Sequence, residues 1–259
     1  MTSYQPLTFY YQEIDSTNDE ALRLLDSHPP PFFVMAARQT SGRGRMGRRW
    51  HSPDGNLYFT AVFEATLQLR ELPLFTLYAS LRVCHAIARL TGANLWLKWP
   101  NDIWIGGKKC AGFLAESPVA PSYGRLLLLG IGLNVNTVDF PKDLSGIATS
   151  LKIETQKEWS LKEIGTILCG EIIEAYEKFS TQRYEVDMMT LWNRYEKLVG
   201  RDIKFEEDGV VHRGRVLGLS PDGSLNVNVN KKAHKLRSGE VTLSKFLRGD
   251  PMRYRKLGK

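Results

Sequence analysis

The order of apolar and polar positions divides the chain into two regions. Up to about residue 198, short apolar runs typical of strands alternate with longer segments whose apolar residues recur at helical spacing. From Gly200 onward the runs are all short and are separated by turn sequences. We therefore expect an α+β domain over residues 1–198, followed by a small β domain over residues 199–259.

The first region is predicted to form a mixed β-sheet with helices on one side. Strands are expected over residues 7–13, 32–37, 56–63, 95–99, 103–105, 110–116 and 126–135. Helices are expected over residues 73–90, 161–179 and 188–198. A further helix is expected from Thr17, because Glu20 follows it at the spacing of a capping box. Gly106-Gly107 suits a tight hairpin turn.

The second region has the pattern of a small β-barrel and carries the excess charge. Asp208-Gly209 and Asp222-Gly223 are turn sequences between short apolar runs. Residues 199–259 contain 14 Lys and Arg against 7 Asp and Glu, whereas the two signs balance in the rest of the chain. Such a basic surface suits an acidic protein partner or nucleic acid, or it serves only as a solvated surface.

Composition excludes several other classes of protein. With 42% hydrophobic and 24% charged residues, the chain is typical of a globular protein. The start lacks the basic and apolar segments of a signal peptide, and no apolar stretch is long enough to span a bilayer, so we expect a cytoplasmic protein without a membrane partner. Cys84, Cys110 and Cys169 form no C-x-x-C pair, so neither a disulfide framework nor a transition-metal site is predicted.

The densest candidate chemistry lies in residues 42–50, Gly-Arg-Gly-Arg-Met-Gly-Arg-Arg-Trp, here called the arginine loop. Four guanidiniums on a glycine-rich backbone suit an anionic ligand, and Trp50 offers an apolar face to a ring system. The loop reads formally as G-x-G-x-x-G, but turn residues follow Gly47 where a dinucleotide site needs a helix. Arg48 stands where a Walker loop needs Lys. The plain alternative is a solvated basic loop.

Four other segments combine small, polar and basic residues. They are Ser16-Thr17-Asn18, Lys98-Trp99-Pro100-Asn101-Asp102, Lys108-Lys109-Cys110-Ala111-Gly112 and Gly130-Ile131-Gly132-Leu133-Asn134-Val135-Asn136. Each alone is also what a capped helix, a proline turn, a hairpin end or a crowded strand would show. Together with the arginine loop, in this order and spacing, they closely resemble the biotin protein ligases, which attach biotin to the carrier domain of biotin-dependent carboxylases. The resemblance covers nearly the whole chain.

This resemblance implies a fold, a reaction and partners. The fold is the catalytic domain of biotin ligases, which is class II synthetase-like, followed by an SH3-like barrel. Biotin's carboxylate attacks the α-phosphate of ATP to give biotinyl-5'-AMP, and a lysine of a biotin carboxyl carrier domain then attacks the anhydride. The expected substrates are therefore biotin and ATP, with Mg²⁺ as the metal. A homodimer is also consistent with the family.

The resemblance also assigns roles to residues. Lys109 and Arg45 are the candidate catalytic groups. The expected biotin contacts are Ser16, Thr17, Asn18, Gln39, Gly42, Arg43, Gly44, Arg45, Trp50, Lys109, Gly112 and Gly130. The expected ATP contacts are Arg45, Arg48, Arg49, Trp50, Asn101, Asp102, Lys109 and Asn134, with Asp102 as a magnesium ligand.

The chain departs from the family at two places. Met46 stands where many relatives carry Arg, so we expect a change in adenylate retention more than in chemistry. The motif that begins at Asp15 lies so near the start that no N-terminal helix-turn-helix domain is expected. We therefore expect no DNA partner and no repressor function.

Two rival functions stay open. A lipoate or octanoate ligase or transferase shares the fold and the acyl-transfer logic, but the arginine loop and residues 98–102 favour biotin. A nucleic-acid-binding module would use the basic residues 231–235 and 253–256. For the basic second region we prefer docking of an acidic acceptor domain.

Overall fold

The first region folds around one mixed sheet in a computed structural model that describes residues 6–237, 239 and 241–243. The strand order is β1-β2-β3-β8-β6-β5-β4, with β7 paired to β8. Their bounds are β1 Leu7–Ile14, β2 Phe32–Gln39, β3 Leu57–Glu64, β4 Leu95–Lys98, β5 Asp102–Ile105, β6 Lys108–Glu116, β7 Val119–Ala120 and β8 Gly124–Leu133. Only the β1–β2 pair is parallel among the pairs of this sheet. The expected mixed sheet is confirmed.

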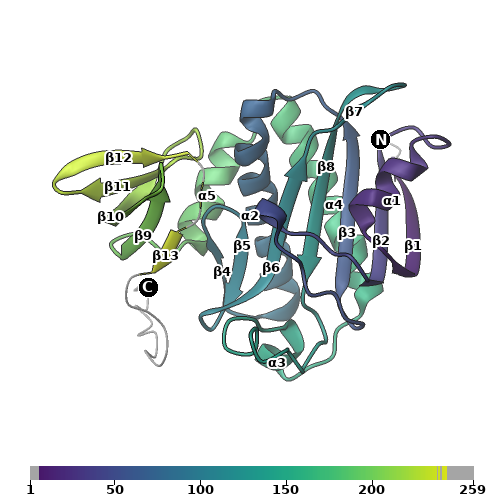
Figure 1. The fold of residues 1–259 in the computed structure, drawn as a ribbon, viewed down its shortest axis with the longest axis horizontal. Coiled ribbons are helices and arrows are strands. Elements are labelled where there is room, and N and C mark those ends of the chain that lie inside the picture. The colour runs from purple at the N-terminus through teal and green to yellow at the C-terminus, as the bar shows by residue number, and fades with distance from the viewer. Residues whose placement is uncertain (1–5, 238, 240, 244–259) are drawn as a thin grey trace.

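One face of the sheet packs against a layer of three helices (Figure 1). These are α2 Leu72–Thr91, α4 Leu161–Ser180 and α5 Glu185–Tyr195. Alternate strand residues such as Phe33, Phe59 and Leu127 point into this layer and are buried in the main core. Because the strand period is two, the intervening residues of the same strands must face the other side.

The expectation of helices on one side only is wrong. Helix α1, Thr17–Leu24, packs on the opposite face of the sheet, where Ala21 joins Phe32, Val34 and Val62 in a second core. The reason is visible in β2, which is buried on both faces. A strand that is apolar at every position needs cover on both sides.

Local details of the elements also differ from the expected ones. Helix α1 begins at Thr17, but its N-cap is Ser16 and no side chain caps it, so the capping box with Glu20 is wrong. The Thr17 hydroxyl instead donates to Gln39. The Gly106-Gly107 turn is present, with both residues at positive φ. Helix α3, Leu151–Thr155, and the short 3₁₀ helices η1, Arg45–Gly47, and η2, Leu69–Glu71, carry no periodic signal in the sequence.

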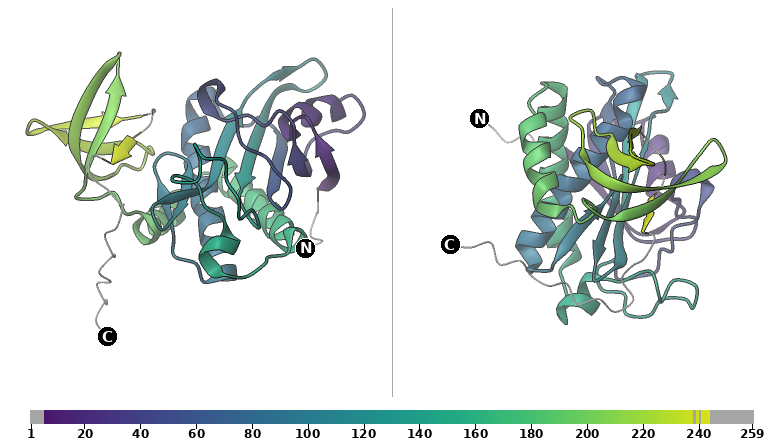
Figure 2. Two further views of the ribbon diagram at one scale, coloured as in Figure 1. Left: turned by 60° about the horizontal axis from the view of Figure 1, so that its bottom comes forward. Right: turned by 90° about the vertical axis from the view of Figure 1, so that its left-hand side faces the viewer.

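The second region is an antiparallel five-stranded sheet of the kind expected for an SH3-like barrel. Its order is β12-β11-β10-β9-β13, with bounds β9 Asp202–Glu207, β10 Val210–Leu219, β11 Leu225–Val229, β12 Lys232–Leu236 and β13 Val241–Leu243. Both expected Asp-Gly turns join strands, and Asn230-Lys231 makes a third turn at positive φ. The barrel lies beside α5 and β4, at the far end of the molecule from β1 (Figure 2). The division at residues 198 and 199 stays a prediction.

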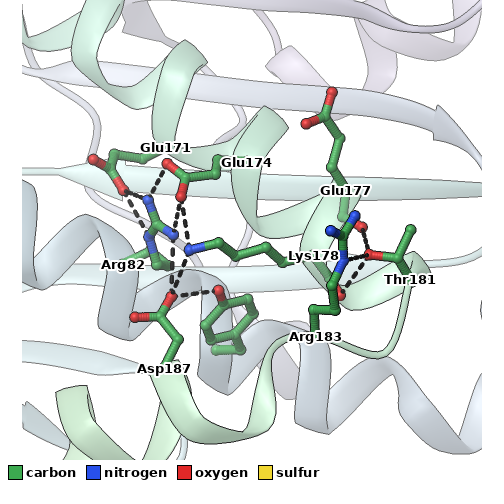
Figure 3. Close-up of polar contacts among 9 residues, drawn as sticks. Arg82, Glu171, Glu174, Glu177, Lys178, Thr181, Arg183 and Asp187 are labelled. Atoms are coloured by element: carbon green, nitrogen blue, oxygen red, sulfur yellow. Dashed lines mark hydrogen bonds and ion pairs between the residues drawn. The ribbon is translucent and has the colours of Figure 1, made fainter.

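A buried arginine joins the three helices of the covering layer (Figure 3). Arg82 of α2 donates to Glu171 and Glu174 of α4, each at 2.8 Å, and to Asp187 of α5 at 3.1 Å. Lys178 adds a second cation, 2.8 Å from Glu174. The hydrogen bond from Arg82 lowers the pKa of Glu174 to about 2. The charges are therefore paired, as buried charges must be.

No helix within residues 6–237 is long and apolar enough to cross a membrane.

Glu174→Gln tests the contribution of these ion pairs to stability. Because folding lowers the pKa of Glu174 from 4.5 to about 2, its ionised form stabilises the fold above pH 4.5, and that contribution is lost as the pH falls toward 2. The variant should lose about 1 kcal/mol at neutral pH, since half-exposed ion pairs are screened, and its stability should decline less steeply in acid. Urea unfolding at several pH values measures both effects. Glu177→Gln, on the same helix, is the control, and equal acid slopes in the two variants would contradict the interpretation.

Candidate active site

One cavity of about 290 Å³ gathers the residues expected to bind ligands. The lining includes Ser16, Thr17, Asn18, Gln39, Arg43, Gly44, Arg45, Arg48, Arg49, Trp50, Asn101, Asp102, Lys109, Gly112, Gly130 and Asn134. Gly42 is the one expected contact outside this lining. A Cβ there would lie 2.4 Å from Ser52 Oγ and 2.8 Å from Gln39 Nε2. Gly42 therefore lets the loop pack closely against Gln39 and Ser52, and its contact with a ligand stays a prediction.

The cavity lies on the face of the sheet that carries α1. The connection from β2 to β3, which contains the arginine loop, crosses in front of the central strands on this face (Figure 1). Lining residues come in sheet order from β2, β8, β6 and β5, from Gln39 to Asp102. Four strand intervals correspond to about 19 Å, so the cavity suits an elongated ligand.

The end of the cavity nearest β2 is lined by neutral polar groups that bond to one another. The backbone N–H and hydroxyl of Thr17 both donate to Gln39 Oε1, at 2.8 and 3.1 Å. Gln39 Nε2 donates to Ser52 Oγ at 3.2 Å. Thr60 Oγ1 lies 2.8 Å from Thr17 Oγ1 and 2.6 Å from Asn18 Oδ1. These polar groups are therefore held in place by their bonds to one another.

Sequence reasoning missed Thr60. It is fully buried in the middle of β3, within an apolar run that reads only as a core strand. The signal that could have found it is its polarity at a position where every neighbour is apolar, because a buried hydroxyl needs a hydrogen-bond partner.

Two glycines of β8 leave room for side chains that cross the sheet. A Cβ at Gly130 would lie 2.7 Å from Asn18 Oδ1, and one at Gly132 would lie 2.4 Å from Trp50 Nε1. The Trp50 indole therefore rests directly on the strand. Its N–H is buried and has no hydrogen-bond partner among the described residues. Burying such a donor without a partner costs free energy.

The arginine loop closes on itself as a small hairpin. Gly44 N donates to Arg48 O at 2.7 Å, and Trp50 N donates to Gly42 O at 2.9 Å. Met46 is at the tip, with a positive φ of 56° and a side chain 82% exposed. The residue that departs from the family pattern thus lies outside the cavity lining.

The arginines of this loop do not all point the same way. Arg43 Nη1 lies 2.8 Å from Asp19 and its Nη2 lies 3.6 Å from Glu116. Arg49 Nη2 donates to Thr40 O at 3.1 Å. Arg43 therefore contacts the cavity as part of an ion pair whose charge is already balanced.

The end of the cavity nearest β5 is charged. Lys109 Nζ lies 2.8 Å from Asp102 Oδ1 and 5.1 Å from the centre of the Trp50 ring. Arg45 Nη1 donates to Asn101 Oδ1 at 2.9 Å. The Asn101 amide in turn donates to the Phe113 carbonyl, so its orientation is fixed. Two cations are thus held on two consecutive residues, Asn101 and Asp102, and each cation keeps further donors that could bind an anion.

An apolar wall that the sequence did not predict completes this end. It consists of Phe140, Leu144, Ile147 and Ala148. Two backbone hydrogen bonds tie the wall to β6, from Lys109 N to Ile147 O at 2.8 Å and from Thr149 N to Lys109 O at 2.9 Å. With Trp50, these side chains can sandwich a flat ring.

A buried tyrosine anchors the end of the connection that follows the arginine loop. Burial raises the pKa of Tyr58 well above its ordinary range, so the phenol is neutral. It donates to Pro53 O at 2.8 Å and accepts from Asn56 Nδ2 at 3.1 Å. The connection is therefore fixed where it enters β3.

The described residues contain no group of three or more His, Cys, Asp or Glu side chains that could hold a metal ion. Asp102 is the acidic side chain that lines the cavity.

Comparison with known proteins gives consistent matches. Residues 9–136 match the biotin/lipoate A/B protein ligase family. The bifunctional ligase/repressor BirA of Bacillus subtilis is 32% identical over 242 residues, which cover 90% of this chain and 73% of that protein. The biotin–[acetyl-CoA-carboxylase] ligase of Paracoccus denitrificans is 38% identical over 47% of this chain and 51% of that protein.

Solved structures match over most of the chain as well. The biotin protein ligase from Aquifex aeolicus, in complex with biotin and ATP, superposes with a TM-score of 0.79 and 29% identity. The match covers 93% of this chain and 99% of that one. The mixed sheet, its helices and the second antiparallel sheet therefore belong to one recurring fold.

Gly132→Ala tests how the arginine loop is held. The new methyl would overlap the Trp50 indole, and overpacking of this kind costs about 1–3 kcal/mol. We expect the loop to open and trypsin to cleave after Arg48 and Arg49 at least about fivefold faster. Gly146→Ala is the matched control, since a Cβ there meets nothing within 4 Å. Equal cleavage rates in the two variants would show that Trp50 does not hold the loop.

Proposed function

The chain belongs to the biotin/lipoate A/B protein ligase family and is a biotin ligase, and we propose that it forms biotinyl-5'-AMP and transfers the biotin to a lysine of a carrier domain. The observation that carries this proposal is the polarity of the cavity. Neutral hydrogen-bonding groups lie at the β2 end, and cations with an apolar wall lie at the β5 end. That order matches a molecule with a polar ring at one end and a nucleotide at the other.

The neutral end suits biotin's ureido ring. The ring offers two N–H donors and a carbonyl acceptor, and Ser16, Thr17, Asn18 and Gln39 offer hydroxyls and amides in return. Ser16, Thr17 and Asn18 are each at most 5% exposed. The dithiolane ring of lipoate offers no N–H or carbonyl group to these polar side chains, so the pocket should discriminate against it. Gly112 and Gly130 would let the backbone of β6 and β8 approach biotin.

The charged end suits adenylation. In the proposed first step, a carboxylate oxygen of biotin bonds to the α-phosphorus while the bond to the bridging oxygen breaks and pyrophosphate leaves. Two anions must approach each other, and negative charge builds up on the phosphoryl oxygens. Lys109 and Arg45 are placed to offset that charge, with Arg48 and Arg49 toward the outer phosphates. Trp50 and the apolar wall would hold the adenine, and Asn134 lies near it.

Asp102 is suited to a magnesium ion brought by ATP. Mg²⁺ is usually bound through one or two carboxylates together with substrate phosphates, so a single aspartate in the cavity fits this mode. Asp102 Oδ1 is already paired with Lys109, which leaves Oδ2 as the candidate ligand atom. The ion would neutralise phosphate charge, while Asp102 keeps Lys109 oriented.

The proposed second step needs access for another protein. The neutral amine of an acceptor lysine attacks the acyl carbon, and AMP leaves with the bridging oxygen. No enzyme nucleophile is required. The basic surface of the barrel is the candidate docking site, because Lys231, Lys232 and Lys235 are exposed on the β11–β12 hairpin. Of the two segments expected for nucleic-acid binding, residues 253–256 lie outside the described residues.

Several narrower expectations stay predictions. They are the absence of a DNA partner and of repressor function, a homodimer, and a cytoplasmic location. The BirA relative named above is described as a repressor as well as a ligase, so titration of the purified chain with DNA is a direct test of the first.

Two measurements test the proposed reaction. The first is pyrophosphate release with Mg²⁺, ATP and either biotin or lipoate, and the second is mass spectrometry of an added biotin carboxyl carrier domain. We expect biotin-dependent release and a biotin-sized mass increase on the acceptor. Release with lipoate alone would move the assignment to lipoate ligation, and no release with either acid would contradict adenylation altogether.

Lys109→Ala should reduce the rate of pyrophosphate release by about 100-fold or more, because it removes a cation that offsets charge in the transition state. Lys108→Ala is the neighbouring control, since its ammonium lies 3.3 Å from Ser145 O and does not line the cavity. An equal loss of rate in both variants would contradict a catalytic role specific to Lys109.

Charge reversal at Lys231, Lys232 and Lys235 tests the docking surface. If the barrel attracts an acidic acceptor, the acceptor's KM should rise about tenfold at low ionic strength and less at high salt. The control reverses three exposed cations of the helical side, Lys157, Lys162 and Arg183. Unchanged acceptor kinetics in the first variant would exclude this docking surface.

A further inference from the structure

A buried tryptophan of the catalytic region donates a hydrogen bond to the barrel. Trp99 is 2% exposed, and its indole Nε1 donates to the carbonyl of Gly223 at 3.0 Å. Gly223 lies in the turn between β10 and β11, 124 positions further along the chain. A buried indole N–H normally has a partner, and here the partner comes from the other sheet.

The turn that accepts this hydrogen bond also packs closely against helix α2. Gly223 has a φ of 77°, and a Cβ there would lie 2.8 Å from Leu74 Cδ1 on α2. The turn therefore packs against the helical layer at the same place where it meets Trp99. This fit requires glycine, both for its conformation and for its size.

Trp99 belongs to the connection that holds both candidate catalytic cations. Lys98 of β4 pairs with Asp102 of β5, so residues 99–101 form the turn between the two strands. At the far end of this turn, Asn101 accepts from Arg45 at 2.9 Å, and Asp102 lies 2.8 Å from Lys109. A shift of this turn would therefore displace the partners of both cations together.

We propose that Trp99 is a positioning residue, through which the β10–β11 turn of the barrel sets the place of Asn101 and Asp102 and hence of Arg45 and Lys109. The proposal rests on the proposed biotin adenylation for its kinetic consequence. The neutral ring pocket lies at the other end of the cavity, on β2 and α1. Loosening the turn should therefore slow adenylation more than it weakens biotin binding.

Trp99→Phe and Gly223→Ala break the contact from its two sides. Trp99→Phe keeps an aromatic ring but removes the donor, and Gly223→Ala displaces the acceptor. Each should lower kcat for pyrophosphate release about tenfold, because small misplacements of catalytic groups are costly, and should change KM for biotin less than kcat, because the ring pocket lies at the other end of the cavity. If both act through one contact, the double variant should be no slower than the slower single variant.

A second readout does not depend on the reaction. Amide hydrogen exchange in residues 101–105 and 109–113 should be faster in both variants than in the parent chain, as expected for a loosened turn. Trp159→Phe is the matched control, because Trp159 donates its indole N–H to Thr155 Oγ1 at 2.9 Å, away from the barrel. It should leave kcat and exchange in these residues unchanged.

Two results would overturn the proposal. One is unchanged exchange in residues 101–105 in both variants, and the other is a lower melting temperature with kcat kept. Failure of the proposed function looks different, because the parent chain itself would then release no pyrophosphate with biotin. The exchange experiment would still decide whether the barrel holds the turn.

Discussion

The charged end of the cavity depends on how its cations are held before a ligand arrives. Lys109 and Arg45 would repel each other, and each is kept in place by a fixed partner, Asp102 at 2.8 Å and Asn101 at 2.9 Å. Both partners are adjacent in one short turn. In the proposed adenylation two anions must approach each other, and cations arranged in advance would need little reorganisation when charge develops.

The two faces of the sheet differ, because helices cover one and the cavity lies on the other. Helices α2, α4 and α5 cover one face of the central strands, and the Arg82 network links them. On the other face, α1 covers β2 and β3 but leaves the strands beyond them to the cavity. There Gly130 and Gly132 allow side chains to lie directly on β8. The main apolar core therefore lies on the helical face of the sheet, and the cavity lies on the opposite face.

Prediction from sequence succeeded where the signal was local. Helix α2 was expected from its apolar spacing, and Gly92 follows its last residue in the left-handed conformation. The Gly106-Gly107 turn was expected because hairpins of two residues need positive φ. The predicted capping box at Thr17 was wrong because a tertiary hydrogen bond replaces it. The Thr17 hydroxyl donates to Gln39, 22 positions away, rather than to its own helix. Thr60 and the apolar wall after Asn136 were missed, because the residues that they contact are distant in the sequence and become neighbours only on folding.

The sequence alone determined the types of most elements, the balance of charge, the glycine-rich cationic loop and the resemblance to a ligase family. All of these depend on residue identity and on spacing within a few turns of chain. The tertiary structure decided which face α1 covers, that Arg43 is paired with Asp19, and that Trp99 reaches Gly223 of the barrel. The last two contacts join residues 24 and 124 positions apart, and local periodicity holds no information about which distant strands and turns become neighbours when the apolar faces are buried together.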